Sequence, residues 1–341
     1  MFGKKTVVRF MTVFALAAMF SVQNISASGK MLIAAGTPIG VKFRTDGVVI
    51  TGIRPSDEGG SPALEAGLRR GDVITSVDGE RINSSDRLCE MIAGSDGKPI
   101  ELTLSRAGKS VGATLSARLD EDGIYRLGIW VRDSASGIGT VTFIDPETLS
   151  FAALGHGICD PESGALLPIL SGSVEQVTLT GITQGKSGMP GEIHGFFSGS
   201  QAGVLSENSF SGVRGSLFAL PENISGEIYP VGDKNDVTEG KAYVFTTIDG
   251  EDGRRKYEIE ITRIDTGASQ KNFTVKVTDP ALIEKTGGII QGMSGSPIIQ
   301  NGKLIGAITH VMISDPSSGY GIFIANMLGN GVLSASYGIA A

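Results

Sequence analysis

The chain has 341 residues, which is long enough for two domains with separate hydrophobic cores. Its 49 glycines, 6% aromatic residues and net charge of −7 argue against a disordered or long-helical protein and favour a turn-rich, mainly β fold. The acidic balance, with no basic stripe, argues against nucleic-acid binding. The three histidines and two cysteines have no metal-site spacing, so we expect no metal and no organic cofactor.

Residues 1–28 have the layout of a signal peptide. A basic lead in residues 4–9 precedes the apolar stretch 10–22, and the small residues Ser26 and Ser28 follow it. The apolar stretch is shorter than the roughly 20 residues of a membrane-spanning helix, although an uncleaved membrane anchor remains an alternative. Either way, we expect the rest of the chain to work outside the cytoplasm.

Residues 29–118 show short strand patterns and two short helices. The segments "GVKFR" and "GVVITGI" are typical of strands, and "SPALEAGL" predicts a helix with Ser61 as its N-cap. A buried strand follows, with a hairpin turn at Asp78-Gly79. The segment "SSDRLCEMIAG" predicts the second helix, and a final hairpin turns near Gly108.

The run "SPALEAGLRRGDVITSVDGERI" resembles the PDZ domains of bacterial proteases. This resemblance implies that "TPIGVKF", residues 37–43, is the carboxylate-binding loop with its adjoining strand. The peptide-binding residues would be Pro38, Ile39, Gly40 and Val41, whose N–H groups from Ile39 onward hold a terminal carboxylate while the peptide adds as a strand. The alternative is that this strand only completes a sheet or docks a segment of its own chain.

Residues 119–341 form the second predicted domain. Strand-like pieces such as "SVEQVTLTGI", "GKAYVFTTI" and "YEIEITRI" are separated by Gly, Asn and Asp, and long amphipathic helical patterns are absent from the sequence. Many short strands with such punctuation favour a β-barrel or a sandwich.

The three histidines differ in their settings. His156 lies in "FAALGHGICD", where small residues bracket it at the end of an apolar strand. His194 looks like an ordinary strand or turn residue. His310 lies in the apolar strand "GAITHVMI" just after a serine-containing turn, where it could line the same site. Of the three, His156 is the candidate general base.

The turn "GMSGSP" resembles the nucleophile turn of chymotrypsin-fold serine peptidases. This resemblance places Ser294, and not Ser296, in the nucleophile position. Gly292 permits a backbone twist, so the predicted oxyanion-binding backbone comprises Gly292, Met293 and Ser294. A histidine upstream of the serine also matches the order of that fold. We therefore expect a PDZ domain followed by a chymotrypsin-like β-barrel peptidase domain.

A catalytic imidazole needs an acid that orients it. Asp279 closes a good β pattern ahead of Ser294, with Asp160 and Asp133 as the next choices. From the residues alone the assignment stays open among five carboxylates: Asp133, Asp145, Asp160, Asp279 and Asp315.

The segments "RDSASGIGTVTFIDPETLSFAALGHGICD" and "TDPALIEKTGGIIQGMSGSPIIQNGKLIGAITHVMISDPSSGYGIFI" are similar to the SpoIVB family of sporulation signalling peptidases. The resemblance implies Ser294 as nucleophile, His156 as base and Asp279 as acid. It implies export from the forespore into the space between two membranes. The implied substrates are the chain itself and a membrane-bound regulator that holds a pro-sigma-factor processing protease inactive.

Two other readings stay in competition with this one. An exported PDZ scaffold without catalysis would bind a signalling partner only. A stress protease of the HtrA type would carry its PDZ domain after the protease domain, whereas here the PDZ pattern comes first. The position of the catalytic candidates in space decides between an enzyme and a scaffold.

Overall fold

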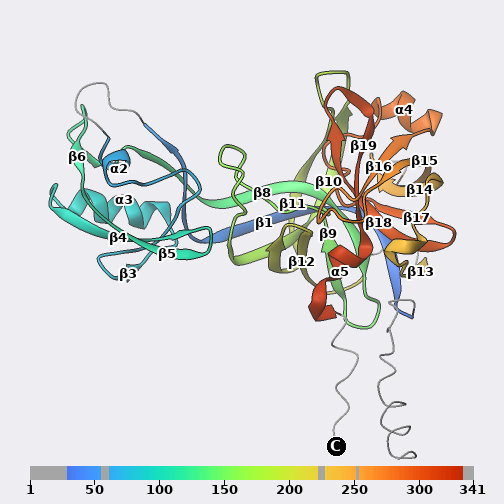
Figure 1. The fold of residues 1–341 in the computed structure, drawn as a ribbon, viewed down its shortest axis with the longest axis horizontal. Coiled ribbons are helices and arrows are strands. Elements are labelled where there is room, and N and C mark those ends of the chain that lie inside the picture. The colour runs from blue at the N-terminus through green and yellow to red at the C-terminus, as the bar shows by residue number, and fades with distance from the viewer. Residues whose placement is uncertain (1–28, 55–60, 222–226, 251–252, 333–341) are drawn as a thin grey trace, which may run out of the picture.

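The structure is a computed structural model that describes residues 29–54, 61–221, 227–250 and 253–332. The predicted signal or anchor segment, residues 1–28, lies outside this part. In the described ranges, no helix is long and apolar enough to cross a membrane. The chain forms a smaller lobe and a larger lobe that are joined by two long strands (Figure 1).

The smaller lobe has its own core of aliphatic side chains packed between short strands and two helices. The predicted Asp78-Gly79 turn is present, with positive φ at both residues, as a two-residue hairpin of this kind requires. Ser61 occupies the N-cap position of the first helix, as expected, but its hydroxyl makes no capping hydrogen bond. The elements of the lobe are α2 (Pro62–Glu65), β2 (Val73–Val77), β3 (Glu80–Arg81), α3 (Ser85–Gly94), β4 (Pro99–Arg106), β5 (Lys109–Ser116), β6 (Arg118–Leu119) and β7 (Tyr125–Arg126).

The larger lobe contains two barrel-like units. In the first, strand pairing runs through β10, β11, β12, β9, β8 and β1, and an additional pairing of β10 with β1 joins the two ends into a ring. Its core is apolar and separate from that of the smaller lobe. The strands are β1 (Met31–Ile53), β8 (Ile129–Ile144), β9 (Ser150–Ala153), β10 (Ile169–Thr183), β11 (Glu192–Ser209) and β12 (Gly212–Leu217).

The second unit is a closed barrel in the order β14-β15-β16-β19-β18-β17. The predicted mainly β architecture with a β-barrel domain is therefore confirmed. Its members and the adjoining short elements are β13 (Ile228–Pro230), η2 (Lys234–Asp236), β14 (Gly240–Thr247), β15 (Arg254–Ile264), β16 (Phe273–Val277), α4 (Pro280–Thr286), β17 (Pro297–Gln300), β18 (Lys303–Met312), β19 (Asp315–Phe323) and α5 (Ile324–Val332).

Strands β1 and β8 belong to both lobes. The end of β1, from Val48 onward, pairs with β2 and with the first residues of β8. The earlier part of β1 pairs with β8 and β10 inside the larger lobe. Residues 119–131, expected in the peptidase domain, contribute instead to the smaller lobe, because β6, β7 and the start of β8 lie there (Figure 1).

The predicted carboxylate-binding loop lies in an unexpected place. Pro38, Ile39, Gly40 and Val41 are strand residues of β1 that pair with β8, and the last two also pair with β10. Gly40 and Val41 have strands on both sides, so their backbone groups are not available to a peptide terminus, whereas Pro38 and Ile39 pair with β8 alone in the described part of the chain. The alternative from the sequence, that this segment completes a sheet, describes their position.

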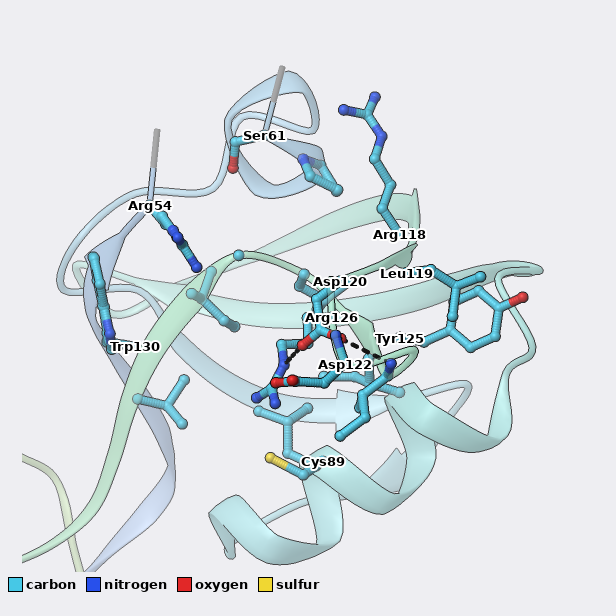
Figure 2. A pocket seen from close by; sticks show the side chains of 18 of the residues that line it. Arg54, Ser61, Cys89, Arg118, Leu119, Asp120, Asp122, Tyr125, Arg126 and Trp130 are labelled. Carbon is cyan, nitrogen blue, oxygen red and sulfur yellow. Dashed lines mark hydrogen bonds and ion pairs between the residues drawn. The ribbon is translucent and has the colours of Figure 1, made fainter. Parts of the chain in front are cut away.

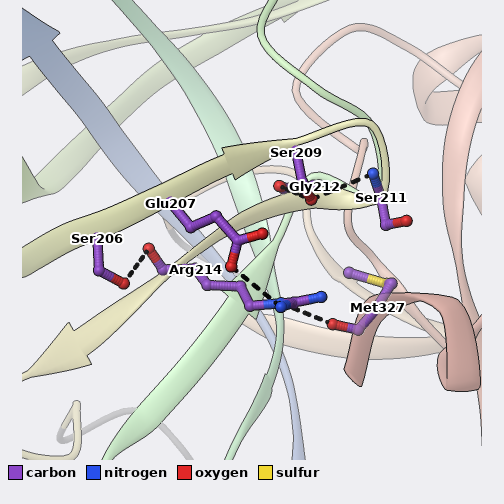
Figure 3. A network of polar contacts seen from close by, with 7 residues as sticks. All are labelled: Ser206, Glu207, Ser209, Ser211, Gly212, Arg214 and Met327. Atoms are coloured by element: carbon purple, nitrogen blue, oxygen red, sulfur yellow. Dashed lines mark hydrogen bonds and ion pairs between the residues drawn. The ribbon is translucent and has the colours of Figure 1, made fainter. Parts of the chain in front are cut away.

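Hydrogen bonds and apolar contacts hold the two units of the larger lobe together. An apolar cluster lies between them and includes α5. Figure 3 shows Arg214 of β12 donating from its Nε to the carbonyl of Met327 in α5, at 2.9 Å, while its side chain also pairs with Glu207 at 3.0 Å. Gly329, beside this guanidinium, has a φ of 60°, a conformation that favours glycine. The last helix is thus fixed against the first unit.

Candidate active site

The serine turn lies at the seam between the two units of the larger lobe. A Cβ at Gly295 would stand 2.0 Å from the carbonyl oxygen of Thr140 in β8, so only glycine fits there. Thr140 also donates its backbone N–H to the Ser294 carbonyl at 3.0 Å and its hydroxyl to the Gly292 carbonyl at 2.8 Å. The turn is therefore held by the neighbouring unit, and its conformation depends on the packing of both.

The two serines of the turn have different environments. Ser296 is fully buried, and its hydroxyl donates to the Thr246 hydroxyl at 3.1 Å. Ser294 is only partly buried, and its hydroxyl donates to the carbonyl of Thr309 at 2.6 Å. Because a nucleophile must reach a substrate, Ser294 is the hydroxyl that can take this role.

His156 follows β9 on a turn in the first unit. The preceding residues, Leu154 and Gly155, both have positive φ, which is an uncommon conformation for leucine and indicates local strain. The next peptides are fixed by Asn208, which receives the Ile158 N–H at 2.9 Å and donates to the Ile158 carbonyl at 2.8 Å. The imidazole is thus carried on a constrained loop.

The hydrogen bond of the His156 ring defines its tautomer. Nδ1 lies 3.0 Å from the carbonyl oxygen of Gly157, which can only accept, so Nδ1 carries the hydrogen. Nε2 is then the nitrogen with a free lone pair, as a general base requires. Burial lowers the pKa of His156 below its usual 6.5, and the Gly157 hydrogen bond opposes this shift. The neutral base is therefore the dominant form at pH 7.

The nucleophile and base candidates meet at one stretch of β18. Thr309 accepts the Ser294 hydroxyl, and its methyl group would stand 3.0 Å from a Cβ on Gly155, the residue before His156. The next residue, His310, has its ring centroid 4.7 Å from that of His156. The sequence suggestion that His310 could line the site agrees with this position. Ser294 of the second unit and His156 of the first unit therefore lie beside the same two residues of β18, Thr309 and His310.

The predicted oxyanion-binding backbone divides into free and occupied groups. Met293 donates its N–H to the Ile290 carbonyl at 3.1 Å, so this group does not point into the site. Within the described ranges, the N–H groups of Gly292 and Ser294 have no acceptor in the protein. Gly292 has a φ of 98°, which glycine adopts readily. These two N–H groups are the donors that could meet a developing oxyanion.

Asp279 lies apart from the histidines. Its carboxylate accepts from Ala281 N at 3.0 Å and Leu282 N at 3.3 Å, as the N-cap of α4, and from Glu258 N at 3.2 Å. Thr274 of β16 is in register with Tyr320, the partner of His310, and Asp279 lies five positions further along. At about 3.3 Å per strand residue, Asp279 is therefore on the order of 15 Å along the chain from Thr274, the residue level with Tyr320 and His310.

The other acid candidates also have partners of their own. In the described part of the chain, no contact joins any of the five carboxylates to His156. Asp133 accepts from Ser85, Asp145 pairs with Lys30, Asp160 accepts from Ser163 and lies 3.9 Å from Arg132, and Asp315 accepts from Ser317 and Ser318. The acceptor at Nδ1 is the Gly157 carbonyl. Sequence reasoning cannot find such an acceptor, because every residue has a carbonyl group.

A second candidate site lies in the smaller lobe, where a cavity of about 900 Å³ is lined by α3, by the start of β8 and by the segment 118–128, which contributes charged side chains such as Asp120 and Arg126 (Figure 2). The helix contributes Leu88, Cys89 and Ile92, and the strand contributes residues 129–131. Cys89 is exposed, and not buried as free cysteines often are.

The strand beside this cavity has an open edge. In the described part of the chain, residues 129–131 of β8 pair with β1 on one side only. Just before them, Gly128 has a φ of 75° and its carbonyl accepts the Arg54 N–H at 2.8 Å. A glycine turn, an open strand edge and an apolar helix face are the parts that strand-adding peptide sites use.

The fold and the serine site define a serine peptidase that carries a PDZ domain. A family model described as SpoIVB peptidase S55 matches residues 123–328, which is more than half of the chain, and a PDZ model matches residues 58–106. The chain belongs to the SpoIVB peptidase S55 family. The predicted family and serine peptidase activity are confirmed, whereas the role of each site residue stays a prediction.

Similarity to individual proteins covers parts of the chain. A putative zinc metalloprotease of Lactococcus lactis is 34% identical over 143 residues, which is 40% of this chain and 32% of that protein. Another from Neisseria meningitidis is 39% identical over 84 residues, or 23% of this chain and 19% of that protein. The chain thus spans less than a third of these relatives. Zinc belongs to their names; in the described ranges, no group of three potential ligands is placed to hold a metal ion.

Two solved structures are also similar in part. The PDZ domain of the SdrC-like protein of Listeria monocytogenes is 26% identical, covers 25% of this chain and 87% of its own, and has a TM-score of 0.22. Rv3671c of M. tuberculosis is 12% identical, covers 60% of this chain and 84% of its own, and has a TM-score of 0.31.

Proposed function

We propose that this protein is an exported serine endopeptidase that cleaves its own chain and a membrane-bound regulator of a pro-sigma-factor processing protease. The observation that carries the catalytic part is the convergence of Ser294 and His156 on Thr309 and His310. Membership of the SpoIVB family supports the sporulation substrate and action in the forespore intermembrane space. Residues 1–28 would supply export or a membrane anchor.

The proposed reaction uses only groups of this chain. Ser294 Oγ attacks the carbonyl carbon of the scissile peptide while His156 Nε2 takes its proton. The protonated imidazole then gives that proton to the leaving amine, and water repeats the sequence on the acyl-enzyme. The N–H groups of Gly292 and Ser294 stabilise the oxyanion, each contributing about 3–4 kcal/mol in comparable sites.

The hydroxyl of Ser294 must change its partner before it reacts. In the substrate-free structure it donates to the Thr309 carbonyl and not to an imidazole. A rotation about χ1 of Ser294 would release this carbonyl and allow a hydrogen bond to His156. Such loose geometry is common in substrate-free enzymes, in which catalytic hydrogen bonds tighten on binding.

Asp279 enters the proposal as a support for the nucleophile turn. The helix that it caps, α4, ends at Thr286 with Gly287 as its C-cap, and the chain then leads into the serine turn. The orienting hydrogen bond at His156 Nδ1 is made by the Gly157 carbonyl instead. The family resemblance gives Asp279 the role of acid, and variants at this position distinguish the two roles.

The smaller lobe would hold a peptide in the cavity between α3 and β8. A peptide adding to the open edge at residues 129–131 would place its terminal carboxylate near the turn at Gly128 and would face α3 at the exposed Cys89, since Leu88 and Ile92 are buried in the core of the lobe. It differs from the peptide-binding site that the sequence predicts at Pro38–Val41. The ligand class is a peptide with a free C-terminus, and an apolar-ended peptide is the probe that suits the apolar strand residues at 129–131.

Substituting Gly128 with alanine tests this groove. The positive φ at this position strains any L side chain, so the turn should shift and weaken binding of an apolar-ended peptide by about tenfold or more. Fluorescence anisotropy with a labelled peptide gives the dissociation constant, and the same peptide with an amidated end checks the carboxylate.

The matched control is Gly79→Ala, which has a similar φ and no atom within 4 Å of the new Cβ, in the turn between β2 and β3. This variant should introduce the same backbone strain as Gly128→Ala, but it should bind the peptide with the affinity of the wild type. Equal weakening in both variants, or equal affinity for the free and the amidated peptide, contradicts the groove assignment.

The competing function is an exported scaffold that binds peptides without cleaving them. The termini of the purified full-length protein decide between the two. We expect mass spectrometry to find new termini in the wild type after incubation, and only the intact chain in Ser294→Ala. Identical cleavage patterns in both proteins would show that the chain does not process itself.

A further inference from the structure

We propose that His310 is a positioning residue that holds His156 in its reactive orientation through face contact between the two imidazole rings. This inference rests on the proposed role of His156 as general base. It assigns a function to the second histidine of the site, which neither the nucleophile nor the oxyanion donors explain.

The position of His310 is fixed by the barrel. It lies in β18, opposite Tyr320 of β19, and follows Thr309, whose hydroxyl donates to the Tyr320 carbonyl at 3.1 Å. The register of β18 shifts between Ile308 and His310, so Thr309 and His310 do not alternate regularly, and the His310 ring lies at the seam beside the loop of His156. There it meets His156, with 4.7 Å between the centroids and an interplanar angle of 38°.

The contact with His310 adds to the single hydrogen bond that orients the His156 ring. Its Nδ1 is held by the carbonyl of the very next residue, Gly157, and no carboxylate in the described ranges reaches it. A single hydrogen bond to an adjacent peptide leaves the ring free to tilt about its own bonds. A second ring from a rigid strand restricts this motion and keeps water from the face that it covers.

His310 is in its neutral form where it packs beside His156. Burial, together with the smaller effects of the nearby His156 and Lys271, lowers the pKa of His310 to about 4. The titratable groups that face the pair are Tyr320 of β19 and Lys271, whose Nζ lies 4.9 Å from the Tyr320 ring centroid. His310 is therefore uncharged at pH 7, and it leaves the proton of the reaction to His156. Its Nδ1 is buried and, in the described part of the chain, has no partner.

The test compares His310→Ala and His310→Phe in full-length protein with a peptide substrate. We expect alanine to lower kcat by about 10- to 100-fold, with KM changed by less than about threefold, because binding is unaffected. Water should then reach His156 and weaken the effect of burial that lowers its pKa. The acid limb of the kcat/KM profile should therefore move to higher pH. Phenylalanine keeps the face contact and should retain kcat within about fivefold and the original limb.

The control is His194→Ala, on the exposed part of β11, which should leave both the rate and the pH profile unchanged. Circular dichroism and the melting temperature verify that each variant is folded. An alanine variant with the wild-type kcat and pH limb overturns the proposal, and so does a folded phenylalanine variant as slow as alanine. If His156→Ala also leaves hydrolysis intact, it is the proposed base that fails, and the two failures are thus distinguishable.

Discussion

Ser294→Ala is expected to lower kcat/KM for a peptide substrate by about 10⁴- to 10⁶-fold, the range found when a nucleophilic serine is removed from other serine peptidases. The hydroxyl is the only part of the side chain that is lost, and it is partly exposed, so the fold should be unaffected. Initial rates with an internally quenched peptide, together with a thermal melt, measure both effects.

Ser296→Ala is the matched control because it lies in the same turn. Its hydroxyl is buried and bonded to the Thr246 hydroxyl, so its loss should cost about 1 kcal/mol of stability with little change in kcat/KM. If Ser296→Ala abolished hydrolysis in a folded protein while Ser294→Ala did not, the nucleophile assignment would be reversed.

His156→Ala is the second variant with a large expected effect, about 10⁴-fold or more on kcat, since loss of the base in comparable sites is nearly as severe as loss of the serine. The pH profile of the wild type provides an independent check. Burial lowers the pKa of His156, so the imidazole stays neutral to lower pH. The acid limb of kcat/KM should therefore have its midpoint below 6.5, with activity lost as the pH falls through it.

Two variants of Asp279 complete this test. Asp279→Asn keeps a side chain that can cap α4, and it should retain kcat within about tenfold if the Gly157 carbonyl orients the base. Asp279→Ala loses the cap and should lower stability by about 1 kcal/mol. A folded Asp279→Asn protein that has lost about 10⁴-fold in kcat would identify Asp279 as the acid of a triad.

Local signals in the sequence correctly indicate much of the fold. The Asp78-Gly79 turn, the N-cap at Ser61 and the strand containing His310 depend on short-range backbone preferences, so they can be predicted from neighbouring residues. The turn around Ser294 is equally local, and its glycines indicate the close approach that the Thr140 carbonyl makes at Gly295.

Long-range pairing is the part that the sequence does not indicate. The segment Pro38–Val41 has the pattern of a PDZ strand, yet it pairs with β8 and β10, because a strand of 23 residues crosses from one lobe to the other. Asp279 fits a triad by its spacing from Ser294, but the spacing does not reveal that its carboxylate caps a helix. The contact of His156 with His310 likewise depends on how two barrels meet.

The central claim is that Ser294 is the activated nucleophile, and covalent labelling tests it most directly. The full-length protein is treated with a fluorophosphonate, digested, and analysed by mass spectrometry to find the modified residue. The account predicts a single phosphonylated serine at position 294, and at least about a hundredfold slower labelling in His156→Ala. A label on any other residue, or equal labelling rates in both proteins, would contradict it.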